Sequence, residues 1–218
     1  MGTNHTYQFR EQFRQKIPKL YSGFFHLFFN FTVLLVSLVV PLTYIGELKT
    51  VELFIIPLVL FLGNVAVYVI HKYPLHRHSR LFKFAYTIHS KYHHVFFTDK
   101  VLVFDSSKDF YILFFPTWVV AGFVLSYFPA LYFIGPYFLS INSICLAMSM
   151  GSLYFLLYEI LHFCSHLPET HSVLRIPGVR YMWEHHKAHH NPKLMASCNF
   201  NIVYPLMDIL MGTKHREK

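Results

Sequence analysis

The chain has 218 residues, of which 54% are hydrophobic and 14% are charged, and its formal net charge is +8. Its mean hydropathy of +0.38 is too high for an ordinary soluble domain and is typical of an integral membrane protein. We expect no nucleic-acid partner, because no binding motif is present and membrane topology explains the basic residues. The three cysteines are an odd number without a Cys-x-x-Cys pattern, which argues against a disulfide framework.

Long stretches without a formally charged side chain predict four membrane spans. The run between Lys19 and Glu47 and the run between Glu52 and Lys72 are each long enough for one transmembrane helix. The uncharged stretch 110–158 is too long for one span and predicts a helical hairpin that breaks near Pro129 or Pro136. The predicted spans are residues 22–45, 52–71, 110–129 and 137–161.

Basic side chains lie almost entirely on one side of these spans. Of the 19 Lys and Arg residues, only Lys49 falls in a connection on the other side. The positive-inside rule therefore places both termini and residues 71–109 and 162–218 in the cytoplasm. The predicted fold class is an all-α membrane protein, with four transmembrane helices and a cytoplasmic helical cap. We expect one domain over residues 1–218, in a bacterial inner membrane or the endoplasmic reticulum.

Histidines are concentrated where two of the apolar runs end. Thirteen of the 16 fall within residues 71–94 and 162–190. Neutral imidazole is the commonest metal ligand in proteins, and so many histidines exceed the needs of one ion. The pattern predicts two metal ions with about five nitrogens each. Imidazole binds iron, copper, nickel and zinc, so the ligand type does not name the metal.

Helical spacing suggests which histidines converge. Residues three or four apart share a helix face, so we expect convergence within three sets: His89 with His93; His162 with His166; and His186 with His189 and His190. His71 and His76 are five apart with Pro74 between them, which indicates a frayed helix end.

The position of these histidines favours chemistry on lipid. A lipid tail can reach the ends of spans two and four while water is excluded, and iron with dioxygen supplies the oxidant that an unactivated C–H bond requires. No Gly-x-Gly-x-x-Gly fingerprint and no cytochrome b5 haem motif is present, so the electrons have to come from a separate protein. The net positive charge suits anionic lipid headgroups or an acidic electron donor.

The order of the histidine boxes resembles that of the fatty acid hydroxylase and sterol desaturase superfamily. The segment 185–190, His-His-Lys-Ala-His-His, is similar to the terminal box of fatty acid 2-hydroxylases, as is Tyr158-Glu159 before His162. Residues 199–213 are similar to the superfamily's closing motif. The resemblance implies a non-haem di-metal oxidoreductase, nominally di-iron, with zinc an alternative in purified protein. It would use dioxygen, lipid and a donor such as cytochrome b5 or ferredoxin.

The resemblance also assigns the metal ligands by motif position. They are His71, His76, His89, His93, His94, His162, His166, His186, His189 and His190. The second box departs from the pattern, because three residues separate His89 from His93 where many members have two. One extra residue rotates His89 by about 100° on a helix. His185 is an alternative to His186, whereas His78 and His171 are interpreted as outer partners of the ligands or as exposed residues.

Several other polar residues accompany the boxes. Glu159 lies one turn before His162 and is interpreted as a hydrogen-bond acceptor that orients a ligand imidazole, or alternatively as an anchor at the membrane boundary. Asp109 and Asp208 are weaker candidates for the same orienting role. Asn64 and Asn142 are expected to form interhelical hydrogen bonds or to line a substrate channel. Outside the metal centre the sequence predicts no catalytic residue.

Three functions remain open at this stage. The leading hypothesis is a membrane-bound monooxygenase that hydroxylates an acyl chain or a related lipid. The same centre could instead desaturate a lipid or oxidise a sterol or carotenoid. A metal transporter would place ligands near the bilayer midplane, whereas His26 is the only histidine well inside a predicted span.

Overall fold

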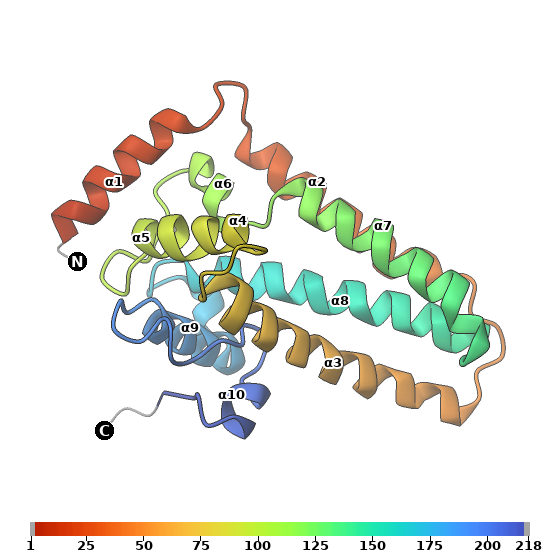
Figure 1. Cartoon of the computed structure of the whole chain (residues 1–218). Coiled ribbons are helices and arrows are strands. Elements are labelled where there is room, and N and C mark those ends of the chain that lie inside the picture. The colour runs from red at the N-terminus through yellow and green to blue at the C-terminus, as the bar shows by residue number, and fades with distance from the viewer. Residues whose placement is uncertain (1–2, 216–218) are drawn as a thin grey trace. The chain divides into compact units, whose positions relative to one another are not determined.

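The computed structural model describes residues 3–215, and this part of the chain is helical without any β-strand (Figure 1). The α-helices are α1 (Thr3–Lys16), α2 (Gly23–Leu42), α3 (Ile55–Ile70), α4 (Lys83–Tyr86), α5 (His94–Phe96), α6 (Phe110–Leu113), α7 (Thr117–Ile134), α8 (Ile141–Ser165), α9 (Pro177–His189) and α10 (Leu206–Leu210). Two π-helical segments, His71–Leu75 and Thr87–His93, follow α3 and α4. Short 3-10 turns are Thr50–Phe54, Ser107–Asp109, Gly135–Tyr137 and Ser172–Arg175. The all-α prediction is confirmed.

Four helical stretches are long and apolar enough to cross a membrane. They are Gly23–Leu42, Thr50–Leu75, Thr117–Tyr137 and Ile141–Ser165. Large apolar side chains on them are left uncovered by protein; Phe28 and Leu125, for example, are 69% and 75% exposed. Lipid would remove this apolar surface from water. The predicted number of apolar helices of membrane-spanning length is confirmed, which suggests a membrane protein.

The third spanning helix lies further along the chain than the predicted 110–129. Phe114 and Pro116 have extended backbone, so α6 ends before them and α7 begins only at Thr117. The residue before a proline avoids helical conformation, which explains the break at this point. Pro129 lies inside α7 instead of ending it, as membrane helices tolerate, and the helix ends at the predicted Gly135-Pro136.

The chain divides into two compact units, each assembled from separate stretches. Among the described residues, the first unit comprises 3–23, 64–114 and 160–215, and the second comprises Phe24–Gly63 and Phe115–Glu159. Both histidine windows belong to the first unit. The single domain expected over residues 1–218 stays a prediction, and residues 1–2 and 216–218 lie outside the described residues.

Close helix contacts build the second unit. A Cβ atom added at Gly63 would lie 2.7 Å from the ring of Tyr154, and one added at Gly151 would lie 2.5 Å from the ring of Tyr127. Only glycine permits this approach between α3 and α8 and between α7 and α8, as is common in membrane helix packing. Asn142 donates to Glu52 at 3.1 Å, which ties the start of α8 to the turn before α3.

A small apolar core seats α9 in the first unit. Leu102, Leu174 and Trp183 pack together and are nearly inaccessible to solvent. The indole of Trp183 also donates to the Leu167 carbonyl oxygen at 3.2 Å. These contacts fix the position of α9, which carries His186 and His189 and ends directly before His190.

Candidate metal centre

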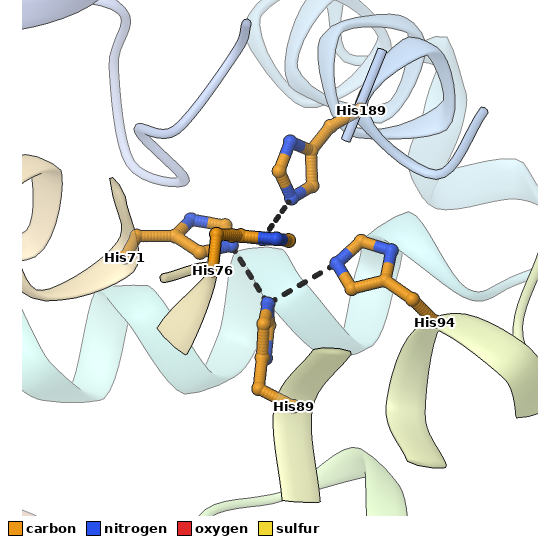
Figure 2. A group of neighbouring side chains, drawn as sticks. All are labelled: His71, His76, His89, His94 and His189. Carbon is orange, nitrogen blue, oxygen red and sulfur yellow. Dashed lines mark hydrogen bonds between the residues drawn. The ribbon is translucent and has the colours of Figure 1, made fainter. Parts of the chain in front are cut away.

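The ten boxed histidines gather into two groups of five, and each group could hold a metal ion. The first cluster is His71, His76, His89, His94 and His189 (Figure 2), and the second cluster is His93, His162, His166, His186 and His190. Within each cluster, the candidate ligand nitrogens lie within 4.8 Å of one another. The predicted pair of metal-binding groups is therefore present.

Ordinary α-helical spacing builds most of the second cluster. His162 lies in the last turn of α8 and His166 directly follows the end of that helix, and their ring centroids are 5.0 Å apart. His186 and His190 have the same spacing at the end of α9, with centroids 4.5 Å apart. Both pairs meet as their sequence spacing predicts.

Five-residue spacing builds the first cluster. His71 and His76 flank one π-helical segment, and their ring centroids are 5.0 Å apart. His89 lies in the other π-helical segment, and its ring centroid is 4.8 Å from that of His94. Because a π-helix bonds residue i to residue i+5, it brings together side chains that an α-helix would separate. The π-helical segment Thr87–His93 therefore accommodates the extra residue between His89 and His93.

Three local expectations are therefore wrong. His71 and His76 do not mark a frayed end, because the π-helical turn continues past Pro74. His89 and His93 belong to different clusters. His186 and His189 also belong to different clusters. Their spacing of three residues on α9 directs the imidazole of His189 towards the segment at Cys198, whose carbonyl oxygen it contacts.

Backbone carbonyls fix the orientation of five imidazoles through their Nδ1 atoms. The pairs are His71 with Phe200 (2.5 Å), His189 with Cys198 (2.8 Å), His93 with Ile112 (3.0 Å), His166 with Leu102 (2.8 Å) and His190 with Phe97 (2.7 Å). A carbonyl oxygen can only accept, so Nδ1 carries the proton in each ring. The lone pair is then on Nε2, which is the arrangement that metal-binding histidines use.

Ser90 orients a sixth imidazole. Its hydroxyl donates to the Leu75 carbonyl oxygen at 2.7 Å, so the Ser90 oxygen is left to accept from Nδ1 of His76 at 3.2 Å. The Nε2 atom of His76 therefore also presents a lone pair. Nothing in the sequence pattern marked Ser90 as a partner of the first box.

Burial keeps the imidazoles neutral. All ten are between 0 and 9% exposed. Burial, reinforced by neighbouring imidazoles, lowers the pKa of His76 to about 2, and burial lowers that of His93 to about 4. The same causes hold the pKa well below its usual value for the other boxed histidines outside the spans, which are His89, His94, His166, His186, His189 and His190. Neutral imidazole is the form that binds metal.

Opposed lone pairs in these clusters fit a bound cation. The Nε2 atoms of His76 and His189 are 3.1 Å apart, although both rings carry their proton on Nδ1. Two lone pairs at this distance cannot form a hydrogen bond, whereas a cation between them would attract both. In the second cluster, Nε2 of His93 and Nε2 of His166 are buried without a hydrogen-bond partner. Metal ligation would offset the cost of burying them.

The separations between ligand nitrogens indicate the kind of coordination. Four Nε2–Nε2 contacts measure 2.9–3.1 Å. Two nitrogens bound about 2.1 Å from one ion lie about 3.0 Å apart at a right angle and about 3.4 Å apart at the tetrahedral angle. Three of these contacts lie in the first cluster and one in the second, and their lengths match ligands at right angles. The five imidazoles of each cluster also exceed the four ligands of a tetrahedral site.

The two clusters adjoin each other. His94 and His190 belong to different clusters, and their rings stack with centroids 4.4 Å apart. His93 and His94 are consecutive and also contribute one ring to each cluster. Two ions held here would therefore be neighbours.

The other polar candidates lie outside the clusters. Glu159 accepts from the side chain of Asn30 and the backbone of Phe115, each at 3.3 Å, and its role towards His162 stays a prediction. His185 lies 3.1 Å from Asp208. Two further histidines make local contacts: the ring of His78 packs against Tyr86, and His171 caps the turn Ser172–Arg175.

Asp109 and Asn64 have structural partners. Asp109 forms an ion pair with Arg14 at 2.8 Å. Asn64 donates to the Tyr204 carbonyl oxygen at 2.7 Å and accepts from the backbone of Met207. Asn64 therefore ties α3 to the C-terminal segment.

No protein-family model, no curated protein and no solved structure matches this chain.

Proposed function

We propose that the protein is a membrane-bound, dioxygen-dependent di-metal monooxygenase that hydroxylates an acyl chain or a related lipid. One observation carries the proposal: two adjoining clusters of five buried imidazoles, most of them with a fixed tautomer, occur at the ends of α3 and α8, which are apolar enough to span a membrane. The resemblance to the fatty acid hydroxylase and sterol desaturase superfamily agrees with it.

The chain's own residues would hold the metals and keep the site dry. Nε2 lone pairs face each cluster, the carbonyl partners of Nδ1 fix the tautomer, and burial keeps the rings neutral. Phe97 packs 4.3 Å from the ring of His166, and Phe200 packs 5.7 Å from that of His189, so apolar rings border both clusters. A dry site protects an oxidising centre from side reactions.

The bound metals would supply the activation of dioxygen. The overall reaction is R–H + O2 + 2 electrons + 2 protons, which gives R–OH + H2O. The Nε2–Nε2 separations, which match ligands at right angles to each other, favour iron over tetrahedral zinc. The two electrons would come from a separate donor such as cytochrome b5 or a ferredoxin, and the formal charge of +8 suits a donor with an acidic surface.

The test is comparative lipid mass spectrometry on cells that express the wild type, His186→Ala or the control His171→Ala. The cells are grown under labelled dioxygen with the donor supplied. We expect a lipid that carries one labelled oxygen atom with the wild type and with His171→Ala, but not with His186→Ala. A lipid that has lost two hydrogens instead would assign desaturation to the same centre.

The contrary outcome is equally clear. If all three proteins are well expressed and the lipids do not differ, lipid oxidation is ruled out for this host, and metal handling becomes the function to test. Isotope uptake by intact cells would then compare the same three proteins.

A further inference from the structure

The carbonyls that orient the imidazoles are themselves held by two side chains from opposite ends of the chain. Asp208 lies in α10 near the C-terminus, and Arg10 lies in α1 near the N-terminus. Both are almost completely buried, at 0% and 1% exposure. We propose that Asp208 positions the first cluster for metal binding and that Arg10 positions the second. The inference rests on the metal centre of the proposed function but does not depend on lipid oxidation.

Asp208 forms hydrogen bonds with the backbone segment whose carbonyl oxygens orient the first cluster. Its carboxylate accepts from the backbone N–H groups of Phe200 and Asn201, at 2.9 and 2.8 Å. It also accepts from the hydroxyl of Thr213 at 2.8 Å. Burial alone would raise the pKa of Asp208, but the hydrogen bond from His185 and those from the backbone lower it below its usual value, so the carboxylate stays ionised.

A single peptide unit transmits this constraint to His71. The carbonyl of Phe200 and the N–H of Asn201 belong to the same peptide plane and point in opposite directions. Asp208 holds the N–H of that plane at 2.8 Å, while the carbonyl accepts from His71 at 2.5 Å. Turning this plane would move the acceptor away from His71.

The same backbone segment also serves His189. Its acceptor is the Cys198 carbonyl, two residues before Phe200. Between them, Asn199 has φ of 59°, in the left-handed region that non-glycine residues avoid. The bonds to Asp208 help to hold this unfavourable conformation, so Asp208 supports two of the five imidazoles in the first cluster.

Arg10 holds a different loop. Its Nε donates to the Phe96 carbonyl at 2.8 Å, and one terminal nitrogen donates to the Val101 carbonyl at 2.9 Å. These carbonyls lie at the two ends of a tight turn closed by hydrogen bonds between Thr98 and Val101. The carbonyls of the two following residues, Phe97 and Leu102, accept from His190 and His166 of the second cluster. The guanidinium thus joins both sides of the loop that orients His190 and His166.

Other contacts would keep α1 in place without Arg10. Arg14 pairs with Asp109 at 2.8 Å and with Asp105 at 2.6 Å. Phe13 packs on the ring of Phe96 with centroids 5.7 Å apart. Substitution of Arg10 should therefore remove its hydrogen bonds to the loop carbonyls without unfolding the protein.

The test measures metal binding by the purified full chain in detergent, without lipid or oxygen. Ferrous iron is added anaerobically against a graded chelator, and bound iron per chain is determined by mass spectrometry. Loss of an outer partner of a metal-binding histidine weakens affinity by about 10–100-fold. We expect Asp208→Asn and Arg10→Gln each to weaken one of two sites by this factor. Glu184→Gln and Arg175→Gln, which change exposed side chains, serve as controls.

Double variants identify the site that each residue serves. Asp208→Asn should add little to His189→Ala, which already disables the first cluster, but should weaken binding of the ion that remains in His190→Ala by the same factor. Arg10→Gln should behave in the opposite way. Arg10→Lys keeps the charge and can reach one carbonyl, so we expect it to restore part of the lost affinity.

The proposal can be falsified because it predicts that each substitution weakens metal binding at one cluster only. Equal weakening of both sites, weakening of neither, or weakening of the other cluster in monodisperse, helical protein would overturn it. If Asp208→Asn aggregates, Thr213→Val removes one bond to the same carboxylate and should weaken the first site only. A wild type that binds two irons but oxidises no lipid would defeat the proposed function and leave this inference standing.

Discussion

The two clusters contain the same number of imidazoles but are built by different means. The second draws two pairs from the ends of α-helices, with a spacing of four within each pair. The first draws its pairs from π-helical segments, with a spacing of five, and its carbonyl partners from near the C-terminus. π-Helical turns are rare and are frequently found at functional sites. Similar ligand sets can therefore arise from different local geometry.

The largest expected effects come from substituting two consecutive histidines, one from each cluster. His189 and His190 are consecutive but belong to different clusters. We expect His189→Ala and His190→Ala each to remove one ion and to reduce lipid oxidation by at least about 100-fold, since the two metals would act together. Bound metal per chain and product yield are the measurements. If either variant loses both ions or keeps both, the division into two clusters is wrong.

A change of spacing tests the π-helical geometry. Inserting an alanine between Phe163 and Cys164 gives His162 and His166 a spacing of five inside a straight α-helix. The insertion rotates one ring by about 100°, so we expect the second ion to be lost. Deleting the exposed Lys91 should be tolerated, because His89 and His94 would then have α-helical spacing and still share a face. Iron titration of both variants checks this, and the reverse order of effects would contradict it.

The pH dependence of the metal-free protein tests the burial of the imidazoles. The folded pKa of His93 is about 4 and that of His76 is about 2, both below the unfolded value. The unfolded chain therefore binds more protons below about pH 6.5, and stability falls as the pH falls towards these folded values. Each such histidine contributes about 1.4 kcal/mol per pH unit in this window.

Thermal unfolding in detergent provides the measurement. We expect the melting temperature of chelator-treated protein to fall between about pH 7.5 and about pH 5.5, and to fall less with iron bound, because bound metal opposes protonation. An unchanged melting temperature in the metal-free protein would show that these imidazoles are not buried.

The smallest expected effect concerns a single hydroxyl. Ser90→Ala removes the acceptor from Nδ1 of His76 and leaves the ligand nitrogen in place. We expect affinity at the first cluster to fall by about 10-fold, with no change at the second. Iron titration checks this, with the exposed Ser106→Ala as the control. Equal weakening of both sites would mean that Ser90 acts on the fold and not on one imidazole.

Local patterns in the sequence determined much of this protein. Apolar runs predicted four spanning helices, because burial in lipid depends on length and composition alone. The α-helical spacing of His162 with His166, and of His186 with His190, predicted that these pairs meet. The density of histidines predicted two metal-binding groups.

Only the tertiary structure decided how the boxes are shared between clusters. His71 and His189 are 118 positions apart in the printed sequence, yet their ring centroids are 4.5 Å apart. No local pattern records such a contact, or the π-helical turns that bring His89 to His94. The supporting carbonyls have the same character: Arg10 reaches Phe96 across 86 residues, and a backbone carbonyl carries no sequence signature. Local hydrophobicity and spacing set the elements, whereas the choice of ligand partners depends on how those elements pack.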